Sequence, residues 1–233
     1  MKLLSAEFVT SAAAGGSADG IPRDGVPHVA FVGRSNVGKS SLLNALCRRT
    51  IARTSAAPGK TRLANVYRAV LDGGPGGPGR WSVYLVDLPG YGYARGGAAG
   101  AEELRAASEA YFRRVTATSE ARGLSPAPEP VATDSGAALK RRASNAPLAA
   151  TLLLVDSRHP GLDSDIAAAE WLDRLGVRRH VVATKIDKLS RAERARNLGD
   201  LERTLGTAAL PVSATSGEGL DELWQTIANL VRR

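Results

Sequence analysis

Short apolar runs alternate along this chain with segments whose apolar residues recur at every third or fourth position. The runs 29–32, 151–155 and 180–183 are largely apolar, as expected of strands that are buried on both faces, and a shorter run lies at 210–212. Segments with helical spacing begin near residue 39 and cover 101–118, 162–175, 190–205 and 220–230. We expect the second of these to turn Leu104, Ala107, Tyr111 and Val115 inward, the third to start at Asp163 or Ser164, and the fourth to be capped by Ser190. This alternation predicts a doubly wound α/β sheet with helices on both faces, and a ligand at the carboxyl ends of its strands.

One pair of strands departs from the parallel pattern. Residues 63–71 alternate between two faces, and 81–86 form a second apolar run after a Gly- and Pro-rich loop at 73–79. Strands that are joined by so local a loop pair antiparallel. The predicted sheet is therefore mixed and mostly parallel, with one antiparallel strand.

Two segments have weaker patterns. Residues 1–28 are predicted to be an N-terminal extension, with a short extended piece at 7–9 and a loop that leads into the α/β domain of residues 29–233. Within that domain, 122–147 contains several prolines and the basic cluster Lys140-Arg141-Arg142 but no apolar period, so we expect a disordered insertion there. The composition leaves open whether this insertion is a solvated linker or an arm that contacts RNA.

The segment that follows the first buried strand carries the first candidate chemistry. It reads Gly33-Arg34-Ser35-Asn36-Val37-Gly38-Lys39-Ser40, which has the form G-x-x-x-x-G-K-S of a phosphate-binding loop. Gly33 and Gly38 permit positive φ and close approach of the backbone to phosphate, and successive N–H groups converge on the phosphate where the helix begins. Lys39 is expected to reach the β- and γ-phosphates and Ser40 to ligate Mg²⁺. The sequence therefore predicts a nucleoside triphosphate site.

A second motif ends the strand at 81–86. It reads Asp87-Leu88-Pro89-Gly90, which has the form D-x-x-G. An aspartate that leaves a strand beside a phosphate loop is placed to hold Mg²⁺, usually through water, and the N–H of Gly90 can meet the γ-phosphate. Asp and Gly are common after strands, but at this distance after a phosphate loop the pair is a strong signal for these two roles.

A third motif predicts which base is bound. Thr184-Lys185-Ile186-Asp187 has the form [N/T]-K-x-D at the end of a buried strand, and Val212-Ser213-Ala214 follows the last strand. The Asp187 carboxylate can accept from N1–H and the exocyclic amine of guanine, whereas adenine would leave it unpaired. The Lys185 stem would lie across the purine and the nucleotide-binding loop, and a backbone N–H at 212–214 would meet guanine O6. These motifs together favour GTP over ATP.

Composition limits the setting of this chemistry. Lys and Arg exceed Asp and Glu by 31 to 23, a net charge of +8, which favours a polyanionic partner such as RNA; an Arg-rich composition without a specific patch is the alternative. The single cysteine, Cys47, fits a reducing cytoplasm. No apolar run is long enough to span a membrane, and the N-terminus does not read as a signal peptide. We expect a cytoplasmic monomer with no membrane insertion and no DNA partner.

The three motifs resemble those of the EngB/YihA (YsxC) family of bacterial ribosome-biogenesis GTPases, within the Era/TrmE-like group. The resemblance covers nearly the whole chain and extends to the segments Ala52-Arg53-Thr54-Ser55, Pro58-Gly59-Lys60-Thr61, Tyr91-Gly92-Tyr93-Ala94 and Asp156-Ser157-Arg158-His159-Pro160. It implies a Ras-like G domain that binds GTP and GDP, with Thr61 joining Ser40 and Asp87 on Mg²⁺. It also extends the nucleotide-binding set to Gly59, Lys60, Thr61, Arg62 and Leu63. The insertion and the Gly/Pro loop are longer than the family pattern.

The resemblance further implies a role in large ribosomal subunit assembly, with effects on cell division and septation, and a partner in the large-subunit precursor (its rRNA and proteins). Many GTPases align the attacking water with a Gln after D-x-x-G, but here that position is Tyr91, so we expect slow intrinsic turnover. In related GTPases an Asn at the position of Asn36 helps to bind a K⁺ that acts as an arginine finger would. The alternative, that Asn36 only hydrogen-bonds within its own loop, stays open.

The candidate catalytic residues are therefore Lys39, Thr61 and Asn36. Two functions remain in competition: a GTP-hydrolysing switch, and a nucleotide-gated module that binds rRNA or the ribosome and hydrolyses GTP incidentally. A small-molecule kinase on the same fold is disfavoured, because the guanine motif would have no role in it.

Overall fold

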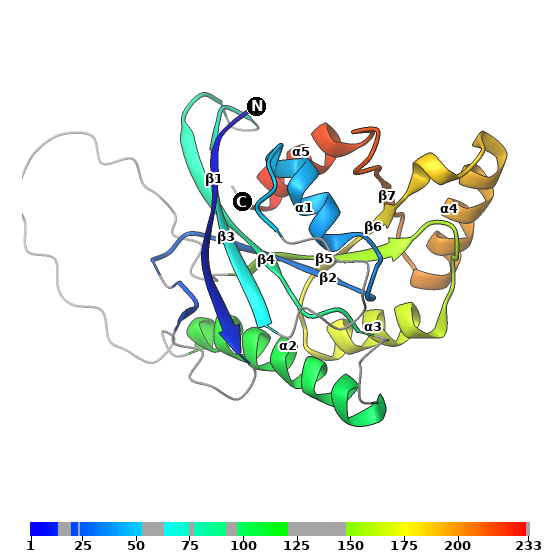
Figure 1. The fold of residues 1–233 in the computed structure, drawn as a ribbon, viewed down its shortest axis with the longest axis horizontal. Coiled ribbons are helices and arrows are strands. Elements are labelled where there is room, and N and C mark those ends of the chain that lie inside the picture. The colour runs from blue at the N-terminus through cyan, green and yellow to red at the C-terminus, as the bar shows by residue number, and fades with distance from the viewer. Residues whose placement is uncertain are drawn as a thin grey trace, which may run out of the picture.

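The computed structural model describes residues 1–13, 20–22, 24–52, 63–74, 77–91, 97–120 and 148–231. Among them, seven strands form one sheet in the order β1-β3-β4-β2-β5-β6-β7 (Figure 1). The strands are β1 (Lys2–Ala13), β2 (His28–Gly33), β3 (Leu63–Asp72), β4 (Arg80–Asp87), β5 (Leu148–Asp156), β6 (Arg179–Thr184) and β7 (Leu210–Pro211). The helices are α1 (Lys39–Cys47), α2 (Gly97–Glu120), α3 (Asp163–Arg174), α4 (Arg191–Leu205) and α5 (Leu220–Val231), with a short 3₁₀ helix η2 (Ile186–Lys188) after β6. The predicted insertion at 122–147 lies outside the described residues.

The mixed sheet predicted from the alternation of strands and helices is confirmed. β3 pairs antiparallel with both β1 and β4, while β2 is parallel to β4 and β5, and β6 is parallel to β5 and β7. β3 is thus the one strand that runs against the others. The carboxyl ends of β2, β4, β5 and β6 therefore meet at one edge of the sheet, which is where the three motifs of the sequence follow their strands.

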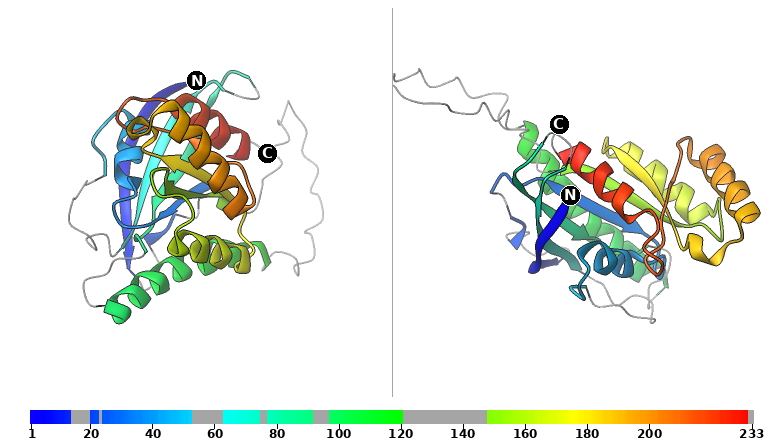
Figure 2. Two further views of the ribbon diagram at one scale, coloured as in Figure 1. Left: turned by 90° about the vertical axis from the view of Figure 1, so that its right-hand side faces the viewer. Right: turned by 90° about the horizontal axis from the view of Figure 1, so that it is seen from above.

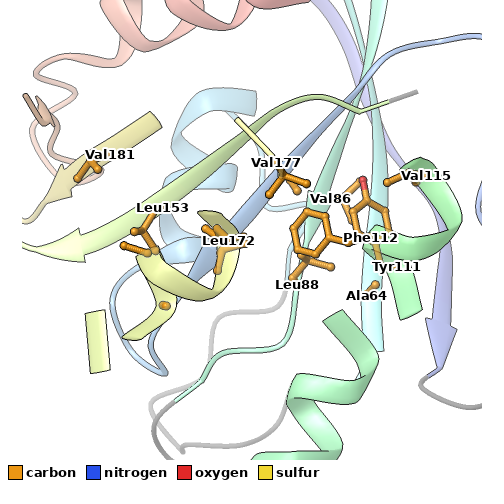
Figure 3. Close-up of a cluster of buried hydrophobic side chains, with 14 of the residues drawn as sticks. Ala64, Val86, Leu88, Tyr111, Phe112, Val115, Leu153, Leu172, Val177 and Val181 are labelled. Atoms are coloured by element: carbon orange, nitrogen blue, oxygen red, sulfur yellow. The ribbon is translucent and has the colours of Figure 1, made fainter. Parts of the chain in front are cut away.

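Helices cover both faces of the sheet (Figures 1 and 2). On one face α1 and α5 enclose a cluster that includes Phe31, Leu43 and Ile227, each 0% exposed. On the other face α2, α3 and α4 enclose a second cluster, part of which Figure 3 shows. Cys47 is fully buried at the end of α1, and burial raises the pKa of its thiol to about 12, so it serves as a small core residue rather than a reactive thiol.

The buried face of α2 includes more residues than the spacing of apolar residues in the sequence predicts. Ala107, Tyr111 and Val115 are buried as predicted, whereas the side chain of Leu104 lies outside the described residues. Phe112 is also buried, at 1% exposure, and its ring meets the Trp171 ring of α3 edge-on at 5.6 Å between centroids. The added residue lets α2 pack against α3 as well as against the sheet.

Helix starts follow the predicted signals in one case and depart from them in another. Ser190 caps α4 in a full capping box, in which its hydroxyl accepts from the Glu193 N–H and the Glu193 carboxylate accepts from the Ser190 N–H. The prediction that Asp163 or Ser164 caps the third helix is wrong, because α3 begins after an extended Leu162 with no side-chain cap. Asp163 and Asp165 lie instead inside its first turn, where the helix dipole favours carboxylates.

The prediction of a short extended piece at 7–9 underestimates the N-terminal strand. β1 pairs with β3 along its whole length, from Lys2 opposite Asp72 to Ala13 opposite Leu63. Two bulges, at Leu4 and Val9, insert an extra residue each and so break the two-residue period by which a strand is recognised. Residues before 29 thus contribute an edge strand to the sheet, and the division of the chain at residue 28 stays a prediction.

A buried histidine occupies the end of β2 that is remote from the motifs. His28 is 0% exposed, its Nδ1 lies 3.3 Å from the Tyr111 hydroxyl, and its ring meets the Tyr84 ring edge-on at 5.0 Å. Burial lowers the pKa of His28 from 6.5 to about 4, although Asp24 opposes the shift. The folded protein therefore holds this imidazole neutral.

We expect His28 to make the protein less stable in acid. The unfolded chain takes up a proton near pH 6.5 and the folded chain only near pH 4, so the free energy of unfolding should fall by about 2 kcal/mol between pH 7 and pH 4.5 from this residue alone. Urea unfolding at both pH values measures it: the loss should shrink in His28→Gln and persist in the exposed-site control His159→Gln. Equal pH dependence in the wild type and His28→Gln would contradict the assignment.

Candidate functional site

The phosphate-loop motif forms a tight turn between β2 and α1. Gly38 has φ 111° and Asn36 has φ 63°, the left-handed region that Gly and Asn tolerate best. Gly33 is required for a different reason than positive φ: a Cβ there would lie 2.8 Å from Val37 Cγ1 and 2.9 Å from the Leu154 carbonyl oxygen. The first glycine thus lets the loop pack on β5, and the second lets α1 begin.

Lys39 points its ammonium group into this turn. Its Nζ donates to the carbonyl oxygens of Gly33 at 3.1 Å and Arg34 at 3.4 Å, and the residue is 8% exposed. Burial lowers the pKa of Lys39, and the carboxylate of Asp87 raises it in part. A largely buried cation with two neutral carbonyl partners is arranged to receive an anionic ligand.

Ser40 and Asp87 place two oxygen groups beside Lys39. The Ser40 hydroxyl donates to Asp87 Oδ2 at 3.2 Å, and Asp87 is 2% exposed. Its other oxygen, Oδ1, has no hydrogen-bond partner within the part of the chain that the structure describes. Burial raises the pKa of Asp87, and Lys39 and Ser40 lower it in part.

The donor set fits Mg²⁺ rather than a transition metal. A hydroxyl and a carboxylate are hard oxygen ligands, and an unpaired buried carboxylate oxygen is the kind of group that a cation satisfies. Among the described residues no three His, Cys, Asp or Glu side chains gather as a metal site. A Mg²⁺ ion held here would therefore take most of its ligands from phosphates and water, as Mg²⁺ commonly does.

The D-x-x-G segment packs directly against the phosphate loop. Leu88, Pro89 and Gly90 are buried, and a Cβ on Gly90 would lie 2.9 Å from the Ser35 nitrogen and 3.0 Å from Lys39 Nζ. Only glycine allows so close an approach of this backbone to the lysine. The motif glycine thus stands beside the ammonium group of Lys39.

The guanine motif is fastened to the same loop. The Thr184 hydroxyl lies 2.8 Å from the Val37 carbonyl oxygen and 3.0 Å from that of Val155. Lys185, with φ 62°, donates from Nζ to the Asn36 carbonyl oxygen at 2.7 Å, so its stem crosses the loop as predicted. The end of β6 and the phosphate loop therefore form one unit although they are remote in sequence.

Asp187 lies in η2 with its carboxylate partly exposed. Its Oδ1 accepts from the Ser213 hydroxyl at 2.7 Å, and this hydrogen bond lowers the pKa of Asp187, so the group is held ionised. Ser213 Oγ also accepts from the N–H groups of Thr215 and Ser216. The sequence predicted only a backbone role for the 212–214 segment, whereas the Ser213 side chain orients the aspartate as well.

Sequence reasoning assigned no role to Asp156, which ends β5 at the same edge. Its carboxylate accepts from Lys185 Nζ at 2.9 Å and from Arg158 Nε and Nη2 at 2.9 and 2.8 Å. These bonds lower the pKa of Asp156 against the opposing effect of burial. The sequence did offer a signal for a role of Asp156 in the site. It is an aspartate directly after a buried strand, and the carboxyl ends of these strands form the site.

The remaining predicted residues divide into three groups. Gly59, Lys60, Thr61 and Arg62 lie outside the described residues, so their predicted roles stay predictions. Leu63 begins β3 with a 37% exposed side chain, and Asn36 is exposed at the loop surface. The Arg34 side chain turns away to Asp165 of α3, with Nε 3.3 Å from Oδ1, so only its backbone belongs to the phosphate loop.

Comparison with known proteins gives consistent results. Residues 28–185 match the model of a family described as 50S ribosome-binding GTPase. A curated relative from Chlorobaculum tepidum, named probable GTP-binding protein EngB, is 38% identical over 230 residues, which cover 97% of each chain. The protein of the same name from Solibacter usitatus is 38% identical over 235 residues, which cover 100% of this chain and 99% of the relative.

Solved structures share the fold. Era in complex with MgGDPNP and nucleotides 1506–1542 of 16S ribosomal RNA matches with a TM-score of 0.62 at 22% identity, over 88% of this chain and 56% of the Era chain. A crystal structure of a probable GTP-binding protein engB matches with a TM-score of 0.55 at 19% identity, over 88% of this chain and 98% of that one. In the described part of this chain no helix is long and apolar enough to cross a membrane.

Proposed function

Because this chain belongs to the EngB family of GTP-binding proteins, which are P-loop GTPases, we propose that it acts as a Mg²⁺-dependent GTP-hydrolysing switch in large ribosomal subunit assembly. One observation carries the proposal: Thr184 and Lys185 of the guanine motif hydrogen-bond to the phosphate loop, which also holds the buried Lys39 ammonium group. Through ribosome assembly the switch would also support normal cell division and septation. A phosphate site, a metal site and a base site on one sheet edge are what such a switch requires.

The phosphate loop provides the proposed triphosphate contacts. Backbone N–H groups from Gly33 to Ser40 would donate to the phosphates at the start of α1, with Lys39 as the point charge on the β- and γ-phosphates. Ser40 and Asp87, joined by Thr61 in the triphosphate state, would hold Mg²⁺, which when bound neutralises charge on the phosphates. Gly59, Lys60, Arg62 and Leu63 complete the predicted nucleotide-binding set.

Base selection rests on Asp187 in the proposal. Its ionised carboxylate would accept from guanine N1–H and the exocyclic amine, with the stem of Lys185 across the purine face. The Ala214 region, which follows Ser213, would donate a backbone N–H to guanine O6. The hydrogen bond from Ser213 supports this assignment because it presents the carboxylate in a fixed orientation.

Intrinsic hydrolysis is proposed to be slow. Tyr91 stands where an amide would align the attacking water, and its hydroxyl is engaged by Asp165 at 2.9 Å. A K⁺ beside Asn36 would supply the missing positive charge in the transition state. Lys39, Thr61 and Asn36 are the residues that we propose to act in the chemical step.

A second candidate function is a nucleotide-gated module that binds rRNA or the ribosome and hydrolyses GTP incidentally. The net charge of +8 favours it, as does the engagement of Tyr91 away from a catalytic role. In both cases the proposed partner is the large-subunit precursor, its rRNA and proteins, not DNA. The proposed setting is a cytoplasmic monomer, which the fully buried position of the single cysteine fits.

We expect Asp187→Asn to reverse base preference. The amide oxygen could still accept from guanine N1–H, but its NH₂ group would face the exocyclic amine of guanine, donor against donor, and would instead match the C2 carbonyl of xanthine. Affinity for GDP should therefore fall on the order of 10²-fold while XDP binding improves. Titration calorimetry with GDP and XDP measures both, and Asp221→Asn, at an exposed site on α5, is the matched control. A variant that keeps its preference for GDP would refute the assignment of Asp187.

Ribosomal particles should distinguish the two candidate functions. We expect large-subunit precursors to bind the GTP-loaded protein more tightly than the GDP-loaded protein in co-sedimentation, and to accelerate GTP turnover at least tenfold. Binding without acceleration would favour the nucleotide-gated module. Sedimentation that is the same with GTP, GDP and no nucleotide would overturn both.

Potassium should raise turnover if Asn36 helps to hold it. Rates measured in K⁺ and in Na⁺ at matched ionic strength are expected to differ several-fold, and Asn36→Ala should remove the difference. Equal rates in the two salts, with and without ribosomal particles, would leave Asn36 as a residue that only shapes its own loop.

A further inference from the structure

Asp165, in the first turn of α3, is a buried carboxylate at the edge of the nucleotide site that none of the sequence motifs includes. It is 1% exposed. Its Oδ1 accepts from the Tyr91 hydroxyl at 2.9 Å and lies 3.3 Å from Arg34 Nε, while its Oδ2 has no hydrogen-bond partner among the described residues. One carboxylate thus joins the phosphate loop, the residue after D-x-x-G and α3; we call Arg34, Asp165 and Tyr91 the Tyr91 clamp.

Tyr91 is held at its backbone as well as at its hydroxyl. Its carbonyl oxygen accepts from the Ser35 N–H at 3.0 Å, in a parallel bridge between Arg34 and Tyr91. Its ring packs against the core cluster under α2 and α3. With both ends fixed, Tyr91 leaves the preceding residue, Gly90, little freedom to move.

The position that the clamp fixes is the one beside the lysine. Gly90 packs so closely on the loop that a Cβ would lie 3.0 Å from Lys39 Nζ. α3 itself packs against the core through Ala168, Ala169 and Leu172, which are buried. Asp165 therefore ties this segment to a packed helix, in addition to the backbone hydrogen bond that Tyr91 accepts from Ser35.

We propose that Asp165 is a positioning residue for the GTPase site: through Tyr91 and Arg34 it holds the Gly90 peptide in place for the γ-phosphate before the nucleotide binds. This inference rests on the proposed function, in which the Gly90 N–H meets the γ-phosphate. If the Gly90 N–H is already in place, less conformational entropy is lost when the γ-phosphate binds. Because GDP has no γ-phosphate, the clamp should matter for the triphosphate and for turnover, and not for GDP.

Tyr91→Phe tests the proposal with the smallest change. It removes only the hydroxyl, which should weaken binding of a non-hydrolysable GTP analogue by roughly 5- to 10-fold, the size of one hydrogen bond, while affinity for GDP stays within about twofold. The rate of GTP hydrolysis should fall together with the affinity for the analogue. Tyr84→Phe is the matched control, because the Tyr84 hydroxyl also donates to a carboxylate, Asp24 Oδ2, at 2.8 Å. Tyr84 lies away from the site, since it pairs with His28 at the end of β2 that is remote from the phosphate loop.

Asp165→Asn is the second test variant, because it keeps the shape of the side chain but removes the charge that pairs with Arg34. It should lower the ratio of analogue to GDP affinity in the same direction, and the double variant with Tyr91→Phe should lose less than the sum of the two. Chemical unfolding of each variant separates stability from binding, because Tyr84→Phe should lose stability without a change in this ratio.

The outcomes are distinct. Equal loss of GDP and analogue affinity in Tyr91→Phe, an unchanged ratio, or a higher affinity for the analogue would each overturn the proposal. Failure of the wild-type protein to bind either nucleotide, or an unaltered preference for GDP in Asp187→Asn, would instead overturn the proposed function. The two failures therefore cannot be confused.

Discussion

The hydrogen bonds from the end of β6 to the phosphate loop are the interactions on which the site depends. Thr184 Oγ1 lies within 2.8 Å of the Val37 carbonyl and within 3.0 Å of the Val155 carbonyl, and Lys185 reaches the Asn36 carbonyl at 2.7 Å. They join the segment after β6, the phosphate loop and the end of β5 into one hydrogen-bonded unit. Without them, two loops that follow different strands would have to be ordered separately each time a nucleotide bound, at a cost in conformational entropy.

The same edge of the sheet holds charges that the rest of the fold does not neutralise fully. The Lys39 ammonium has two carbonyl partners, and Asp87 keeps one buried oxygen without a partner among the described residues. Each arrangement opposes stability, because desolvation disfavours the charged form. In the proposed function, a triphosphate and its Mg²⁺ would supply the missing partners of both groups, so bound nucleotide would stabilise the fold.

Two carboxylates outside the motifs each join separate segments of this site. Asp156 holds Lys185 and Arg158 at the base side, and Asp165 holds Tyr91 and Arg34 at the phosphate side. Both are buried at the ends of elements that the core fixes. A buried carboxylate with strong donors is costly to form but specifies one arrangement of its neighbours.

The sequence alone determined the parts of this protein that depend on local spacing. Phosphate loop, D-x-x-G and T-K-x-D are each contiguous, and the period of apolar residues located the strands and helices that carry them, including the antiparallel β3. It missed the length of β1, because the bulges at Leu4 and Val9 break the period. Only the tertiary structure decided that Asp165 meets Tyr91 and Arg34, and that Ser213 orients Asp187. Such partners lie far apart along the chain and have no fixed spacing, so their meeting follows from how helices and strands pack and not from any local pattern.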